Sequence, residues 1–190
     1  AGEAPATVHW HHCGGHNVAN AVAAMAAARH VGVLPQVAAE ALSIFRGVKR
    51  RLELLGTVHG VSVYDDFAHH PTAIAATLQG LRARAGKGRL LALIEPRSNT
   101  MRQGQHRDRL AASCENADRV YWFQPPNMDW SLEDVAATSP VPASVIRDID
   151  DLVEAVRHEV DAGDQVVIMS NGGFGGIHGK LLQALEMAGD

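Results

Sequence analysis

The feature that most constrains the fold is a regular alternation of short apolar runs with amphipathic stretches after residue 60. Runs such as 90–94 and 166–169 have the length and composition of strands buried on both faces. The stretch 71–84, which precedes the first of these runs, has helical periodicity and begins with proline, which suits the first turn of a helix. Strands that alternate with helices are typical of a mostly parallel sheet covered on both faces, so we predict an α/β fold.

The same patterns of apolar and turn residues predict further strands and helices. Residues 51–58 and 61–65 alternate around His59-Gly60, a turn-like dipeptide, and predict a β-hairpin. Residues 17–42 are rich in alanine and predict two helices joined near Gly32 and Pro35, with a boundary to the α/β segment near 46–50. The remaining strands are expected at 89–94, 119–123 and 165–170, and the remaining helices at 105–115, 149–160 and 177–187. The stretch 125–142 is rich in turn residues and predicts no regular element.

Composition narrows the class of protein. With 46% apolar residues and a net charge of −4, the chain resembles an ordinary globular protein, and no basic field indicates a nucleic-acid partner. The apolar runs are far shorter than the roughly 20 residues of a membrane span, so we expect no membrane association and a cytoplasmic location. The two cysteines, Cys13 and Cys114, lack close pairing and predict neither a disulfide framework nor a cysteine-built zinc site.

Histidines crowd the start of the chain, together with Cys13. The residues of this group are His9, His11, His12, Cys13 and His16. They lack the paired ligand spacing of a zinc site, so we predict no physiological metal here.

Three polar stretches follow predicted strands, at 65–71, 95–104 and 171–178. Ligands of parallel α/β sheets bind beyond the carboxyl ends of the strands, so these stretches are candidate site loops. The glycine-rich stretch 171–178 has neither GxGxxG spacing nor the Lys-Ser/Thr of a P-loop, and its glycines would let backbone amides approach a carboxylate. Arg97 is a natural partner for the same carboxylate, with a turn-stabilising role as the alternative.

Three further groups of residues suit a nucleotide. Asn17 and Asn20 lie three residues apart on one helix face and could bind adenine, or Asn17 could simply cap the helix. The basic cluster 46–51 could bind phosphates or be a solvated turn. The stretch YDDFAHHP at 64–71 offers carboxylates for ribose or a metal, with structural capping by Asp66 as the competing interpretation.

Taken in order, the patterns GxHNxxNA, FxGxxRR and DDxxHHP resemble the second half of a Mur ligase. The sequences EPRSNTM and SNGGFGGIHGKLL further resemble the branch of this family that joins the murein tripeptide L-Ala-γ-D-Glu-meso-diaminopimelate to UDP-N-acetylmuramate in peptidoglycan recycling. The resemblance implies that residues 1–46 are the helical tail of a central ATPase domain and that residues 47–190 are a Rossmann-like carboxyl-terminal domain. It also implies ATP and Mg²⁺ as cofactors, with most magnesium ligands in a central domain that this sequence lacks, so we expect the fragment alone to be inactive.

The resemblance also implies roles for individual residues. Asn17 and Asn20 would contact adenine, Arg51 the phosphates or ribose, Asp66 the ribose, and His70 the substrate near the reacting centre, as its catalytic residue. From loop position we expect the tripeptide to contact Arg97, Ser98, Asn99, Asn171, Gly172 and Gly173.

Two alternatives remain open at this point. The chain could come from the related ligase that adds L-alanine to UDP-N-acetylmuramate, or it could be a non-catalytic module that binds a nucleotide or a partner. The sequence predicts no oligomeric state.

Overall fold

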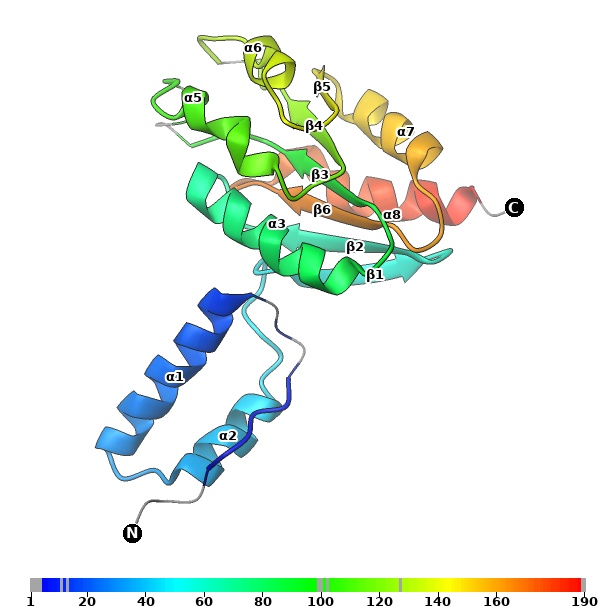
Figure 1. Ribbon diagram of the computed structural model, residues 1–190. Helices are drawn as coiled ribbons and strands as arrows, with labels where there is room; N and C mark the ends of the chain where they lie inside the picture. Colours follow the sequence, from blue (N-terminus) through cyan, green and yellow to red (C-terminus); the bar gives the residue numbers. More distant parts are fainter. Residues whose placement is uncertain are drawn as a thin grey trace. The chain divides into compact units, whose positions relative to one another are not determined.

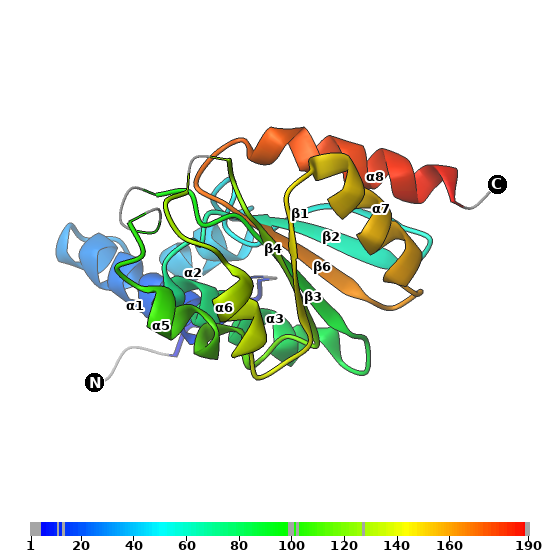
Figure 2. The same ribbon diagram turned by 90° about the horizontal axis from the view of Figure 1, so that it is seen from above.

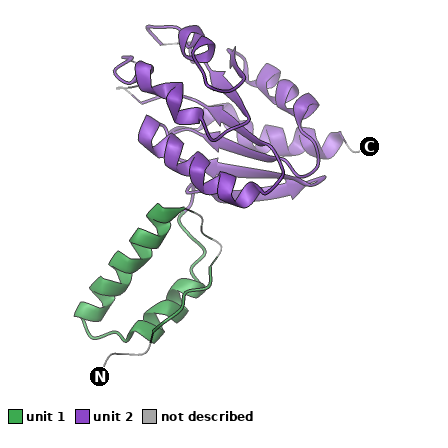
Figure 3. Ribbon diagram, in the orientation of Figure 1, with its two compact units in different colours: residues 1–48 green, residues 49–190 purple. Residues whose placement is uncertain are grey.

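The structure, a computed structural model, describes residues 5–10, 12, 14–98, 101, 103–126 and 128–188. The chain divides into two compact units, residues 1–48 and residues 49–190 (Figure 3). Each unit is described by itself. The assignment of the first unit to the tail of a central domain stays a prediction.

The first unit consists of two helices, α1 (Gly15–His30) and α2 (Pro35–Ser43). Helix α1 begins after Gly14, whose φ of 88° needs no strain in a residue without a side chain. The turn between the helices contains Gly32 at φ 92°, and Pro35 starts the second helix, as predicted.

The second unit is a six-stranded sheet with helices on both faces (Figures 1 and 2). The strand order is β1-β2-β6-β3-β4-β5, and only the β1–β2 pair is antiparallel. The strands are β1 (Glu53–Val58), β2 (Val61–Asp66), β3 (Leu90–Ile94), β4 (Arg119–Phe123), β5 (Ala143–Ile146) and β6 (Gln165–Met169). The helices are α3 (Pro71–Ala85), α5 (Arg107–Leu110), η1 (Ala112–Cys114), α6 (Glu133–Ala137), α7 (Ile149–Glu159), η2 (Phe174–Gly176) and α8 (Ile177–Met187). The predicted α/β class with a mostly parallel sheet is confirmed.

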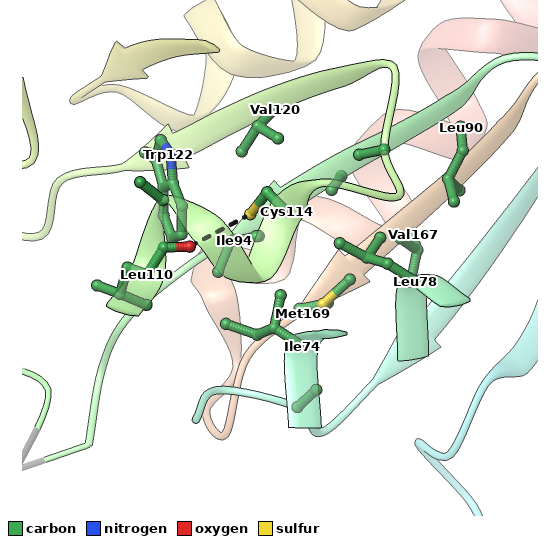
Figure 4. Close-up of a cluster of buried hydrophobic side chains, with 14 of the residues drawn as sticks. Ile74, Leu78, Leu90, Ile94, Leu110, Cys114, Val120, Trp122, Val167 and Met169 are labelled. Atoms are coloured by element: carbon green, nitrogen blue, oxygen red, sulfur yellow. Dashed lines mark hydrogen bonds between the residues drawn. The ribbon is translucent and has the colours of Figure 1, made fainter. Parts of the chain in front are cut away.

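Alternate residues of the strands β2 to β6 serve two cores, one on each face of the sheet. Leu90, Ala92 and Ile94 of β3 pack with α3, α5, η1 and α6, whereas Leu91 and Leu93 pack with α7 and α8. The first core includes Cys114, whose thiol lies 3.8 Å from the carbonyl oxygen of Leu110 (Figure 4). Burial raises the pKa of Cys114 to about 12, so this cysteine is a core residue and not a reactive thiol.

The hairpin turn forms at the predicted dipeptide. His59 and Gly60 both have positive φ, 47° and 84°, as in a type I′ turn that matches the twist of the two strands. No described helix is long and apolar enough to cross a membrane.

Two predictions of secondary structure need correction. The helix expected over 105–115 is only the short α5 followed by the 3-10 turn η1. The Ser113 hydroxyl donates to the Leu110 carbonyl oxygen at 2.6 Å, which tightens the chain where the α-helix would have continued. The stretch 125–142, where no element was expected, contains α6, and β5 follows it.

Asp164 connects the amino-terminal ends of the inner strands. Its buried carboxylate accepts from the backbone N–H groups of Arg89 and Asp161 and from the Arg89 guanidinium, with Nη2 at 2.6 Å. Burial alone would raise the pKa of this carboxyl, but the Arg89 guanidinium and the two N–H groups outweigh it and lower the pKa below the ordinary value of 3.8.

We therefore predict that Asp164→Asn lowers the free energy of unfolding by about 2 kcal/mol at neutral pH, since it removes the charged partner of Arg89 and sets an amide group against a backbone N–H. Because the folded-state pKa lies below 3.8, the stabilisation from the charge is complete above that value and is lost as pH falls through the lowered pKa. Urea unfolding between pH 7 and pH 3 measures this difference. If the difference in free energy of unfolding between the parent and Asp164→Asn stays constant or grows toward pH 3, this prediction is wrong.

Candidate functional site

Three strand ends lie side by side at the carboxyl edge of the sheet. Met169 at the end of β6 pairs with Asp66 of β2 on one side and with Ile94 of β3 on the other. The polar stretches after these strands therefore start next to one another. They are far apart in sequence, and the insertion of β6 between β2 and β3 brings them together.

The turn after β6 is tied to the loop after β3 by a pair of buried polar side chains. The Ser170 hydroxyl donates to Glu95 Oε2 at 2.5 Å and accepts from the Gly172 backbone N–H at 2.9 Å. Ser170 is fully buried and Glu95 is 5% exposed, so water competes little for these bonds. Glu95 and Ser170 thus fix the start of the turn 170–173, a role that the sequence did not indicate.

Arg97 lies against this turn. A Cβ placed on Gly172 would come within 2.4 Å of Arg97 Nη1 and 2.7 Å of its Cδ, so only glycine allows this approach. The Arg97 side chain is exposed, and Asn171 beside Gly172 has a buried Oδ1 with no hydrogen-bond partner among the described residues. The structure thus brings Arg97 together with Gly172, one of its predicted loop partners.

Two other predicted tripeptide contacts belong to the same loops. Ser98 follows Arg97, and Gly173 precedes η2 with an ordinary φ of −81°. Asn99 lies outside the described residues, as do His11 and Cys13 of the amino-terminal histidine group. Among the described residues, no three His, Cys, Asp or Glu side chains are grouped to hold a metal ion.

Asp66 is a structural residue, whatever else it does. Its Oδ2 accepts from the Leu52 N–H at 2.8 Å, and its Oδ1 accepts from the Ala68 N–H at 2.7 Å and the Thr77 hydroxyl at 3.2 Å. The side chain is buried, and burial raises the pKa of this carboxyl although the three donors oppose the rise. Helix α3 is capped by His70 and not by Asp66, so the capping interpretation of Asp66 is wrong, and its ribose role stays a prediction.

The guanidinium groups of Arg50 and Arg51 both lie close to the aromatic ring of Phe67. The guanidinium carbons of Arg50 and Arg51 are 5.3 Å and 5.4 Å from the centre of the Phe67 ring, close enough for cation–π attraction. Arg51 is exposed, which leaves its guanidinium accessible to a ligand. Arg50 is instead engaged by the protein: it bonds Asp65 and the carbonyl oxygens of Ser170 and Gly172.

His70 caps helix α3 by accepting the Thr72 N–H at its Nδ1. That hydrogen bond places the proton of the neutral ring on Nε2. The ring lies 4.5 Å from that of His106, an arrangement the sequence did not predict. Burial first, and then the nearby His106 and Arg109, lower the pKa of His70, so it is a neutral Nε2–H donor at pH 7.

Asn17 and Asn20 lie in the first two turns of α1, within the first unit. The helix cap is Gly14, not Asn17, so the capping alternative for Asn17 is wrong. Asn20 is exposed. The adenine role of both residues stays a prediction.

Comparison with known proteins agrees with this geometry. The model of the Mur ligase glutamate ligase domain matches residues 50–172. The chain is 50% identical to UDP-N-acetylmuramate–L-alanyl-γ-D-glutamyl-meso-2,6-diaminoheptandioate ligase of Escherichia coli (strain K12), over 97% of the chain and 40% of that enzyme. It is 34% identical to UDP-N-acetylmuramate–L-alanine ligase of Mycobacterium sp. (strain JLS), over 91% of the chain and 37% of that enzyme.

Solved structures lead to the same family. The crystal structure of a murein peptide ligase from Psychrobacter arcticus superposes with a TM-score of 0.73 at 47% identity, over 94% of this chain and 38% of that one. The chain thus spans about 40% of the length of the first of these relatives. On these matches and the strand-end site, the chain belongs to the Mur ligase family, with its glutamate ligase domain at residues 50–172.

Proposed function

We propose that this chain is the part of a cytoplasmic, ATP-dependent amide ligase that closes over ATP and binds the murein tripeptide L-Ala-γ-D-Glu-meso-diaminopimelate. The complete reaction would join the tripeptide to UDP-N-acetylmuramate in peptidoglycan recycling. The observation that carries the proposal is the 50% identity to the tripeptide-using enzyme over 97% of the chain, against 34% to an L-alanine ligase. The shared glutamate ligase domain supports ligase chemistry in either case.

The loop geometry supports a substrate with several carboxylates. Arg97 presents a planar fork that can pair with a carboxylate in two places, and the turn at Gly172 lies directly against it. The tripeptide offers carboxylates at its D-glutamyl and diaminopimelyl residues, whereas L-alanine offers only one, next to the reacting amine.

The nucleotide side of the proposal rests on four residues. Asn17 and Asn20 would contact adenine, and the exposed Arg51 would contact phosphate. Asp66 would contact the ribose, and three of the roughly four acceptor positions of its carboxylate are already taken by the protein. ATP, with Mg²⁺, would supply the phosphoryl group that activates the sugar-linked carboxylate.

His70 suits stabilisation of negative charge. Because its Nδ1 accepts from the Thr72 N–H, its Nε2–H is the donor available to a substrate oxygen that gains charge as the amine attacks. A neutral donor of this kind holds the oxygen without taking part in proton transfer.

The test is the choice of amine by an intact ligase that carries this chain. We expect ADP release in the presence of UDP-N-acetylmuramate to depend on tripeptide and to stay at background with L-alanine. Equal ADP release with both amines would leave the ligase assignment standing but contradict the tripeptide assignment. A rate that responds to L-alanine alone would favour the alternative ligase.

A further inference from the structure

We infer that Arg50 is a positioning residue for the amine substrate, which holds the turn 170–173 in the shape that receives a carboxylate. The inference rests on the proposed function for the identity of that substrate. Arg50 belongs to the basic cluster 46–51, which the sequence suggested as a phosphate site. In the structure its guanidinium instead donates to carbonyl oxygens of the turn after β6.

The Arg50 guanidinium joins three groups from two strand ends. Its Nη2 donates to the carbonyl oxygens of Ser170 at 2.7 Å and Gly172 at 2.8 Å, and its Nε donates to Asp65 Oδ2 at 3.1 Å. Only arginine offers several donors in one rigid plane with this reach. A lysine ammonium would keep the charge but not the fixed arrangement of these bonds.

The backbone of Arg50 is itself held in place. Its φ of 59° is unusual for a residue with a side chain, and both backbone groups are bonded. The N–H donates to Glu53 Oε2 at 2.7 Å, and the carbonyl oxygen accepts from the Phe67 N–H at 2.9 Å. The guanidinium therefore projects from a fixed point at the end of the sheet.

Asp65 is equally well placed to hold the guanidinium. Its side chain is 9% exposed, and its second oxygen lies 3.1 Å from Nε2 of His178 in the first turn of α8. These two atoms are close but make no hydrogen bond, so the contact that Asp65 provides here is its bond to Arg50. The turn 170–173 is fixed at its start by Ser170 and Glu95, and in its middle by Arg50.

The direction of the two carbonyl groups has a chemical consequence. In a trans peptide the C=O and N–H bonds point in opposite directions. Because Arg50 draws in the carbonyl oxygens of Ser170 and Gly172, the N–H groups of Asn171 and Gly173 point away from it. These two N–H groups are left on the side of the turn away from Arg50, where each can donate to an anion. Arg50 would thus prepare two donors that act together with Arg97 on a substrate carboxylate.

The experiment compares Arg50→Lys and Arg50→Gln with a matched surface control, Arg157→Gln, whose side chain pairs with Glu154 on the exposed side of α7. In the intact ligase, both Arg50 variants are expected to raise KM for tripeptide about tenfold, the effect of losing one or two charge-assisted bonds, with KM for ATP unchanged. In the 190-residue chain, both should speed hydrogen exchange at the Gly172 amide, whose bond to Ser170 Oγ depends on the shape of the turn. The control should change neither quantity.

Each other outcome is decisive. If Arg50→Lys has the tripeptide KM of the parent, charge alone suffices and the positioning role is wrong. If both Arg50 variants are unfolded by circular dichroism at the assay temperature, the guanidinium serves the fold and the inference is wrong. If KM for ATP rises instead, Arg50 belongs to the nucleotide site. A parent ligase that does not use tripeptide contradicts the proposed function, whereas unchanged exchange at the Gly172 amide contradicts the Arg50 inference alone.

Discussion

An intact ligase that carries Gly172→Ala is expected to lose about thirtyfold in kcat/KM for tripeptide, equivalent to about 2 kcal/mol of charge-assisted bonding. The added methyl group would lie 2.4 Å from Arg97 Nη1 and 2.9 Å from Cζ, so the guanidinium must leave the turn. Arg97 is exposed and can move at little cost in stability. The substitution should therefore remove a substrate contact and leave the fold intact.

Two comparisons isolate this effect. Gly179→Ala in helix α8 is the matched control, because a Cβ there meets nothing within 4 Å. In an Arg97→Ala background, Gly172→Ala should cost little more, since both changes remove the same contact. Full activity of Gly172→Ala, or additive losses in the double variant, would show that Arg97 on Gly172 is not part of the tripeptide site.

Asp66→Asn is expected to lower the free energy of unfolding by about 3 kcal/mol, the largest effect on stability among these substitutions. The amide group that replaces one carboxylate oxygen would face a backbone N–H of Leu52 or Ala68, donor against donor. One N–H belongs to the residue before β1 and the other to the loop after β2, so Asp66 holds both segments. A buried donor that loses its acceptor costs more than the bond itself contributed.

Thr77→Val is the control for this prediction. It removes the third donor to Asp66 but keeps both backbone bonds, so it should cost about 1 kcal/mol. Urea unfolding of the three proteins at neutral pH compares them. An Asp66→Asn chain as stable as the parent would remove the structural role of Asp66 and leave its carboxylate for the ribose alone.

Much of the fold could be predicted because each inner strand is buried on both faces. Such strands are continuous apolar runs, and β3, β4 and β6 were expected within one residue of their observed ends. Strand β5 was missed because its residues are only partly buried at the sheet edge, so its composition resembles that of a loop. The length of the helix at α5 was overestimated, because apolar periodicity cannot show that a serine hydroxyl donates to a carbonyl oxygen of the helix.

The candidate site was predicted in part. Loop position and residue type indicated Arg97 and the glycines of the turn, since polar residues after buried strands are conspicuous. The sequence did not show that β6 lies between β2 and β3, and without that order the partners of Arg50 were unknown. Arg50 stands beside Arg51 in one basic cluster, and only the structure separates them, one held by carbonyl oxygens and the other exposed.

The most direct test of the account is a titration of the isotope-labelled 190-residue chain with tripeptide and, separately, with L-alanine. Millimolar tripeptide is expected to shift the backbone amides of Arg97 and of Asn171–Gly173, and L-alanine at the same concentration is expected to leave them unchanged. Tripeptide that shifts none of these amides, or L-alanine that shifts them equally, would contradict this expectation.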